Sequence, residues 1–224
     1  DFARRIEQVS QPAPSTPTTL DERPETIPLS TAQTRLWFTN RLDQSSAAYN
    51  MAGYVELGPE HDPSVLVQAF AAVVDRHETL RTRYPSVDGE PVQEILSADT
   101  VVHSVTAPIR QVSDADVDDV VTELAARGFD LAAEVPVRFT VLAKPSGFLA
   151  LIVLHHITGD GMSLSPLVRD LLTAYDALRT GRDVAFTPLP LQYIDHTIWQ
   201  RQILGDPDDG NSLARAELDF WRRE

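Results

Sequence analysis

The stretch VRFTVLAKPSGFLALIVLHHITGDG, residues Val137 to Gly161, decides how this chain can fold. It holds two apolar runs, Val137–Ala143 and Phe148–Leu154, separated by Lys-Pro-Ser-Gly, which is a strong turn signal. The second run is apolar at every position, so we expect a strand with both faces buried. The sequence therefore predicts two strands joined by a tight turn.

Two histidines, His155 and His156, end the second strand. Successive side chains on a strand point to opposite faces, so the two rings should face opposite ways. They cannot comfortably share a metal ion, and no second group of ligands is visible, so we expect no metal site. One ring should pack against the core and bond to backbone, and the other could line a cleft. On this pattern alone, a histidine at a strand end is more often structural than catalytic.

Asp160 stands between two glycines just beyond the histidines. The simplest interpretation is a surface turn between a strand and a helix. A sharper hypothesis needs a buried partner, and Arg138 stands in the otherwise apolar first strand, where a guanidinium is costly to bury without a carboxylate. We therefore expect that Arg138 and Asp160 could pair and hold the loop that carries the histidines. The local pattern leaves both interpretations open.

The surrounding sequence alternates strand and helix patterns. Ser30 and Asp62 are typical helix caps, and Asp62 is followed by proline at the first helical position. Further elements are predicted at the following residues: helices at 31–42, 64–80, 114–128, 164–178, 191–204 and 213–223, a strand at 48–58, and a hairpin formed by 81–85 and 91–96. The predicted fold class is α/β, a sheet-and-helix sandwich around one sheet.

Composition excludes several classes of function. The 224 residues carry a formal net charge of −14, which argues against binding to a phosphate backbone. No cysteine is present, so thiolate metal sites and disulfides are excluded within these residues. The longest apolar run is too short to span a bilayer, and no signal-peptide pattern opens the chain. We expect a soluble cytoplasmic protein.

The first 28 residues differ in composition from the rest. A short helical pattern at 1–10 precedes a tract rich in Pro, Thr and Ser, and five of the 16 prolines lie before residue 29. Such a tract is typical of an extended linker. We expect residues 1–28 to be a linker from a preceding domain.

Four stretches of the chain, taken in order, resemble the motifs of one protein family: the condensation domains of nonribosomal peptide synthetases. They are STAQTRLWF (Ser30–Phe38), RHETLRTRY (Arg76–Tyr84), HHITGDG (His155–Gly161) and YIDHTIW (Tyr193–Trp199). GFDLAAEVPVRFTVL, before the histidines, also resembles the usual lead-in to the family's active-site motif. The resemblance implies a fold like that of chloramphenicol acetyltransferase, in which two similar lobes enclose the active site.

The resemblance implies a reaction and a role for each residue of the histidine stretch. A donor peptidyl or acyl thioester and an acceptor aminoacyl thioester would be joined by a peptide bond. His156 would be the catalytic residue, which orients the acceptor amine and accepts its proton. His155, Asp160, Gly161 and Arg138 would support the active site. The other three motifs are expected to be largely structural.

The resemblance also implies partners. Both substrates would be carried on the phosphopantetheine arms of carrier domains, one upstream and one downstream, and the domain itself would bind no cofactor and no metal. The preceding domain would be a carrier. Residues 29–224 would form the N-terminal lobe, with the second lobe absent from this chain, so we expect the lobe alone to be inactive. An adjacent adenylation domain is also implied. Nucleic acid and membrane are not expected partners.

Several alternatives stay open at this stage. Epimerization domains share the histidine motif and the fold, and the first motif and the linker favour condensation over them. Heterocyclization domains carry aspartate in place of the first histidine, so His155 argues against that class. A free acyltransferase is less compatible with the linker. A non-catalytic docking module on the same fold is possible, because fold alone does not fix function.

Overall fold

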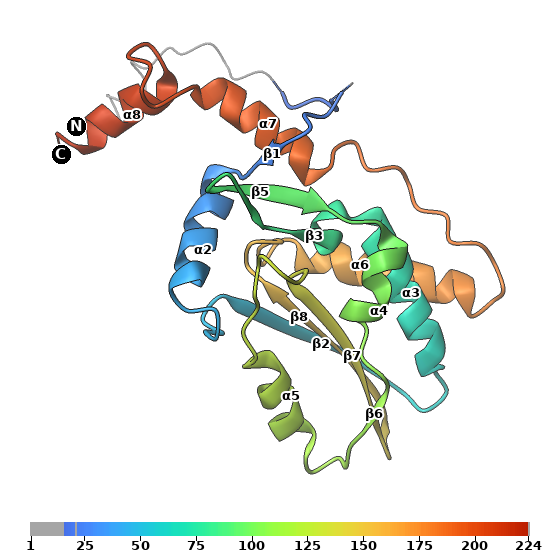
Figure 1. Cartoon of the computed structure of the whole chain (residues 1–224). Coiled ribbons are helices and arrows are strands. Elements are labelled where there is room, and N and C mark those ends of the chain that lie inside the picture. The colour runs from blue at the N-terminus through green and yellow to red at the C-terminus, as the bar shows by residue number, and fades with distance from the viewer. Residues whose placement is uncertain (1–15, 21, 224) are drawn as a thin grey trace, which may run out of the picture. The chain divides into compact units, whose positions relative to one another are not determined.

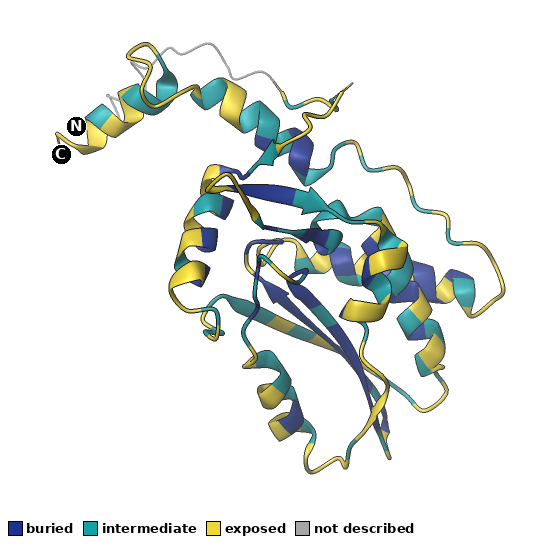
Figure 2. Ribbon diagram, viewed as in Figure 1, coloured by how far each residue is buried: buried dark blue, intermediate teal, exposed yellow. Residues whose placement is uncertain are grey.

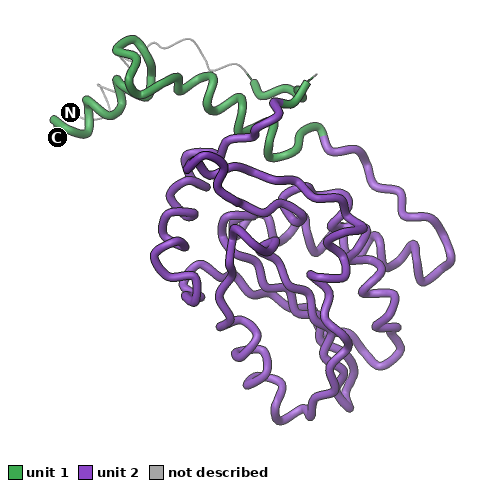
Figure 3. The backbone as a smooth tube through the Cα atoms, viewed as in Figure 1, with its two compact units in different colours: residues 1–23, 190–224 green, residues 24–189 purple. Residues whose placement is uncertain are grey.

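A computed structural model of the chain describes residues 16–20 and 22–223. The helix predicted at 1–10 lies outside the described residues. The chain divides into two compact units, which Figure 3 distinguishes by colour. The larger unit comprises residues 24–189, and the smaller unit comprises the residues before and after it. Each unit is described by itself.

The larger unit is a mixed α/β structure (Figure 1). Its helices are α2 (Thr31–Leu42), α3 (Pro63–Arg76), the 3-10 helix η1 (Glu78–Arg81), α4 (Ala98–Val105), α5 (Val117–Ala125) and α6 (Leu164–Leu178). Its strands are β1 (Ile27–Pro28), β2 (Asn50–Leu57), β3 (Thr82–Arg83), β4 (Ser86–Val87), β5 (Glu90–Ile95), β6 (Arg110–Gln111), β7 (Val137–Lys144) and β8 (Gly147–His155).

The main sheet has the strand order β2-β8-β7-β6. The predicted pair of strands around the Lys-Pro-Ser-Gly turn is confirmed: β7 and β8 are antiparallel, with Arg138 opposite Val153. On its other edge β8 pairs with β2, which places Asn50 opposite His155. The histidine stretch therefore begins at the end of a central strand.

Both faces of β8 are buried, as its continuous apolar run predicts. Figure 2 shows β7 and β8 as the most continuously buried strands of the unit. One core cluster joins alternate residues of β7 and β8 to α3, α4 and α6: Leu66, Phe70, Val73, Val101, Val105, Phe139, Ile152, Leu154, Leu167 and Leu171. The other cluster joins the opposite face to α2 and α5: Leu36, Trp37, Val120, Phe129, Leu149, Leu151 and Val153.

The expected single sheet is replaced by two. The predicted hairpin of residues 81–85 and 91–96 forms, since β3 and β5 are antiparallel, but it belongs to a second sheet with the order β1-β5-β3. Strand β4 also pairs with β5. Both edges of β5 are thereby occupied, so β5 has no free edge with which to join the main sheet.

The predicted helices form, with some shifts at their ends. Ser30 and Gln33 make a reciprocal capping box at the start of α2, and Asp62 caps α3 with Pro63 in its first turn. The helix predicted through residue 80 ends at Arg76 and continues as η1. The helix predicted at 114–128 is shorter, Val117–Ala125. The sequence patterns did not predict α4 or the two-residue strands β1, β4 and β6.

The smaller unit contains α7 (Tyr193–Leu204) and α8 (Leu213–Trp221), both at predicted positions. Asp195, which belongs to the fourth motif, accepts hydrogen bonds from the backbone N–H groups of Gln192 at 2.8 Å and Leu20 at 3.3 Å. Asp195 therefore caps α7.

Within the described residues, no helix combines the length and the apolar character that crossing a membrane requires.

Candidate active site

The histidine stretch leaves β8 as a tight loop that leads into α6. The backbone N–H of His155 donates to Pro136 O at 3.0 Å, and that of His156 donates to Tyr49 O at 2.8 Å. His155 is the last residue of β8 and His156 is the first residue of the turn that follows, and each is held by a different neighbouring segment. The prediction that one of the two rings packs in the core is confirmed, because His155 is buried, whereas His156 is exposed.

His155 is the buried ring, with an exposed fraction of 2%. Its Nδ1 accepts a hydrogen bond from the Ile157 backbone N–H at 3.1 Å. The ring lies near the rings of Tyr49 and Phe129, with centroids 6.1 Å and 6.4 Å away. Burial, together with the neighbouring His156, lowers the pKa of His155 to about 4. His155 is therefore neutral near pH 7 and carries its proton on Nε2.

His156 is the exposed ring. Its Nδ1 lies 2.9 Å from the carbonyl oxygen of Gly159. A carbonyl oxygen can only accept, so Nδ1 must donate and must carry the proton. In the neutral ring the lone pair is then on Nε2, which is the nitrogen that can accept a proton from a substrate.

Asp160 is an exposed turn residue. Its Oδ1 accepts from the backbone N–H groups of Met162 and Ser163, both at 3.0 Å, and from Ser163 Oγ at 2.9 Å. The Ser163 hydroxyl and backbone bonds contribute most to a lowered pKa of Asp160. Asp160 therefore closes the turn before α6. A Cβ on Gly161 would meet no atom within 4 Å, so crowding does not explain a glycine there.

The predicted ion pair between Arg138 and Asp160 is wrong. The Arg138 guanidinium donates to the carbonyl oxygens of Arg127 at 2.8 Å and Gly128 at 2.6 Å, and pairs with Glu134 at 3.1 Å. The β7–β8 register places Arg138 opposite Val153, where the segment after α5 offers these acceptors. Asp160 instead bonds within its own turn.

Arg138 also contacts the surroundings of His155. Its guanidinium lies 3.6 Å from the centroid of the Phe129 ring, and the Phe129 ring also lies near that of His155. Burial lowers the pKa of Arg138, and the Glu134 carboxylate opposes that shift. Arg138 thus lies behind the buried histidine rather than beside the loop of Asp160.

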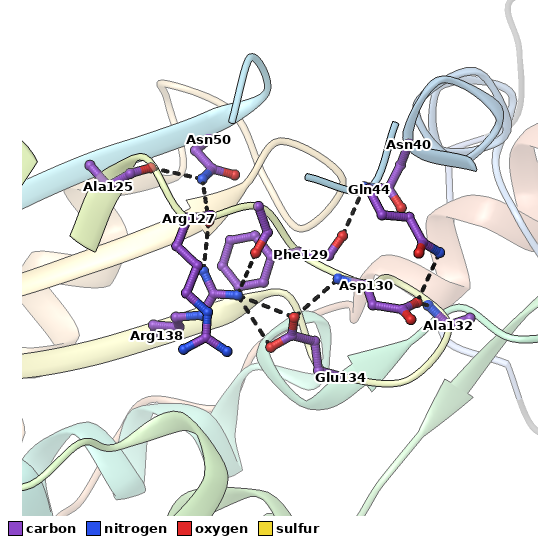
Figure 4. A network of polar contacts seen from close by, with 11 residues as sticks. Asn40, Gln44, Asn50, Ala125, Arg127, Phe129, Asp130, Ala132, Glu134 and Arg138 are labelled. Atoms are coloured by element: carbon purple, nitrogen blue, oxygen red, sulfur yellow. Dashed lines mark hydrogen bonds and ion pairs between the residues drawn. The ribbon is translucent and has the colours of Figure 1, made fainter. Parts of the chain in front are cut away.

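Two asparagines near this site were missed in the sequence. Asn50 donates to the carbonyl oxygens of Ala125 and Arg127, and Asn40 donates to that of Phe129 at 2.9 Å (Figure 4). Both side chains have a buried Oδ1 with no hydrogen-bond partner. The sequence did offer a signal for each: Asn40 is a polar residue at a buried position of α2, and Asn50 is the first residue of β2.

The second motif forms a buried polar cluster between α3 and α6. Asp170 Oδ2 accepts from Arg76 Nε at 2.8 Å and lies 2.9 Å from His77 Nε2. Burial alone would raise the pKa of Asp170, but the bonds from His77 and Arg76 outweigh it, so the pKa is lowered. Burial lowers the pKa of His77 despite the Asp170 bond. This cluster ties α6 to the core.

No group of three or more His, Asp or Glu side chains that could hold a metal ion occurs among residues 16–20 and 22–223. The candidate site thus has four ionisable side chains: the exposed imidazole of His156, the buried imidazole of His155, the carboxylate of Asp160 in the turn, and the guanidinium of Arg138 stacked on Phe129.

Comparison with known proteins places these features in one family. A family model described as "Condensation domain" matches residues 24–223. The chain is 43% identical over 203 residues to a probable non-canonical nonribosomal peptide synthetase, CymA, of Salinispora arenicola, covering 90% of this chain and 3% of that protein. It is 42% identical to a dimodular nonribosomal peptide synthase of Bacillus subtilis, covering 90% of this chain and 8% of that protein. The chain thus spans under a tenth of the length of these curated relatives.

Solved structures show the same fold. The X-domain in its complex with OxyB from teicoplanin biosynthesis matches with a TM-score of 0.81 and 28% identity, covering 93% of this chain and 45% of that chain. A mutant starter condensation domain of the rhizomide synthetase RzmA matches with a TM-score of 0.68 and 21% identity, covering 80% of this chain and 44% of that chain.

Proposed function

This chain belongs to the condensation-domain family of nonribosomal peptide synthetases, and from this premise we propose that it catalyses peptide-bond formation. The donor is a peptidyl or acyl thioester and the acceptor is an aminoacyl thioester, each tethered to a carrier domain. The product is the donor group joined to the acceptor nitrogen.

One observation carries the proposal: the exposed ring of His156 has its Nδ1–H engaged by Gly159 O, which leaves the lone pair of Nε2 available. A positioned neutral imidazole of this kind can accept a proton in a reaction. His155 cannot take this role, since it is buried and its Nδ1 already accepts a backbone bond.

The proposed step balances as follows. The acceptor amine nitrogen attacks the donor carbonyl carbon and forms a tetrahedral intermediate with a positively charged nitrogen. His156 Nε2 accepts the excess proton from that nitrogen as the carbon–sulfur bond breaks. The negatively charged oxygen re-forms the carbonyl, the sulfur leaves with the bonding electrons, and it takes the proton back from His156, which gives an amide, a free thiol on the donor arm and a neutral imidazole.

An α-amine needs little activation because its pKa is about 8, close to physiological pH. Holding the two tethered substrates together can therefore contribute more to the rate than proton transfer does. We assign His156 two tasks: orienting the amine and accepting its proton.

The remaining site residues support the loop in this proposal. His155 fills the core behind His156, and Asp160 closes the turn that presents Gly159 to the ring. Arg138 packs on Phe129, which in turn lies beside the ring of His155. The backbone amide of Gly161 lies in the same turn and is available to shape the reacting centre.

The proposed working assembly is larger than this chain. It comprises an upstream donor carrier, joined through residues 1–28 as a linker, a downstream acceptor carrier, a second lobe that completes the active site, and an adjacent adenylation domain. Residues 29–224 would be the first lobe. We expect it to be inactive alone, because the family encloses its site between two lobes.

The experiment supplies the intact synthetase that carries this domain with loaded donor and acceptor carriers, and follows both arms by mass spectrometry. We expect the acceptor arm to gain the mass of the donor group while the donor arm becomes a free thiol. Carrier binding without transfer would refute the proposal and would favour a docking module. Inversion of the bound residue without elongation would favour epimerization.

A further inference from the structure

The segment from the end of α5 to Phe129 is held through its main-chain carbonyls by side chains from other elements (Figure 4). Asn50 Nδ2 donates to Ala125 O at 2.8 Å and to Arg127 O at 2.9 Å. Arg138 and Asn40 donate to the carbonyls that follow, at residues 127, 128 and 129. We call this set of bonds the carbonyl network.

Asn50 differs from the other members in its place beside the histidines. It is the strand partner of His155 in the β2–β8 pair. The residue before it, Tyr49, accepts the backbone N–H of His156 at 2.8 Å and places its ring 6.1 Å from that of His155. Asn50 therefore directly follows Tyr49, the residue whose carbonyl oxygen accepts the backbone N–H of His156.

The chemistry of the Asn50 contacts requires a carboxamide. Two carbonyl oxygens accept from one nitrogen, so the side chain must supply two N–H donors, which neither a carboxylate nor an aliphatic group can do. Its Oδ1 is buried without a partner, which costs free energy. The two hydrogen bonds that Asn50 donates are thus what this side chain contributes to the structure, in spite of the cost of its unpartnered Oδ1.

We infer that Asn50 is a positioning residue for His156. By joining the end of α5 to the start of β2, it fixes Tyr49, and the Tyr49 carbonyl in turn fixes the direction in which the main chain carries His156 toward Gly159. The inference rests on the proposed function for its catalytic consequence. Its structural consequence, a single tautomer of the His156 ring, does not depend on turnover.

The first test measures the tautomer by nitrogen NMR on the 224-residue chain labelled in its six histidines. The signal of His156 is identified by its loss in His156→Ala. In the wild type we expect the proton on Nδ1 and a bare Nε2. In Asn50→Leu we expect both tautomers to be populated, since the ring loses its fixed approach to Gly159 O.

A matched control comes from the same region. Gln44 lies near the carbonyl network and donates to the Asp130 carboxylate at 3.3 Å, but it binds none of the network's carbonyls. Gln44→Leu removes a similar amide and should leave the tautomer of His156 unchanged. Asn50→Ser keeps one donor and should give an intermediate mixture; it also serves if Asn50→Leu does not fold.

The second test measures turnover of loaded carriers by the intact synthetase. We expect Asn50→Leu to lower kcat by about 10- to 100-fold, the scale of a small misplacement of a reacting group, with KM for both carriers unchanged. Gln44→Leu should retain wild-type kcat.

The outcomes separate the two proposals. A wild-type tautomer and wild-type kcat in Asn50→Leu would overturn the positioning role. Loss of kcat only in proportion to the unfolded fraction, with the tautomer unchanged, would also overturn it and leave Asn50 structural. If even the wild type forms no product, the proposed function fails, while the tautomer comparison still decides the role of Asn50.

Discussion

The two adjacent histidines are fixed in opposite tautomers by single backbone bonds. Nδ1 of His155 accepts from Ile157 N–H, whereas Nδ1 of His156 donates to Gly159 O. The same side chain therefore serves as a buried neutral acceptor at one position and as an exposed ring with a bare Nε2 at the next. The end of β8 falls between the two rings: His155 is the last strand residue and is buried, whereas His156 lies in the following turn and is exposed.

Replacing His155 by asparagine should flatten the dependence of stability on pH. Burial lowers the pKa of His155 from 6.5 to about 4, so between these values the unfolded chain binds more protons and stability falls as pH falls. This group alone should cost the wild type about 2 kcal/mol between pH 7 and pH 5. In His155→Asn, whose Oδ1 can still accept from Ile157 N–H, that part of the loss disappears.

Urea unfolding of both proteins at the two pH values measures the difference. Other titrating groups, including His77, are common to both chains and cancel in the comparison. An equal loss of stability on acidification in wild type and variant would contradict the assigned burial of His155.

Asp160 should tolerate asparagine but not alanine. Its role is to accept the bonds of Met162 N–H and Ser163 N–H through one oxygen, which an asparagine oxygen can also do. Asp160→Ala should lower the free energy of unfolding by about 1 kcal/mol, the scale of a lost capping bond. Asp160→Asn should melt close to the wild type. Thermal melts that show equal losses in both variants would indicate a charge-dependent role instead.

At the scale of elements, α6 carries the loop's far end and is held to α3 by a buried ionic contact. The side chains of Arg76 and Asp170 are only 12% and 8% exposed. Their bond, together with that of His77, supplements the apolar contacts between the two helices. The position of the turn that presents Gly159 therefore depends on contacts made along α6.

Removing the Asp170 carboxylate should be strongly destabilising. Asp170→Ala removes the buried carboxylate that binds both Arg76 and His77, and breaking this buried contact from one side should cost about 3 kcal/mol in the free energy of unfolding. Asp176→Ala, which removes an exposed partner of Arg179 on the same helix, should have little effect and serves as the control. Denaturant unfolding that finds the two variants equally stable would refute the role of this contact.

At the scale of the whole chain, the sequence predicts most of the features that depend on local residue patterns. It predicts few of the contacts between residues that lie far apart in the chain. The apolar run of β8, the caps Ser30 and Asp62, and the amphipathic pattern of α6 depend on local periodicity, and the structure confirms them. The Arg138 partners depend on which segment covers one sheet face, so local pattern pointed to Asp160 instead. Asn50 was missed for the same reason: its two acceptors lie more than 70 residues along the chain.

The sheet arrangement shows the same limit. A single sheet was expected because strands and helices alternate, but β1 and β4 are two-residue strands that no periodicity reveals. Together with β3, they pair with β5 and form the second sheet. The roles of the histidine-stretch residues remain predictions, which depend on chemistry rather than on fold.

The most direct test of the central claim is the rate of elongated thioester formation by the intact synthetase in a single turnover, compared between wild type and His156→Ala. We expect the variant to fold normally, because the ring is exposed, and to form product about 100-fold more slowly, the scale of lost acid–base catalysis. A variant that elongates the acceptor at the wild-type rate would contradict the assignment of His156 as the catalytic residue.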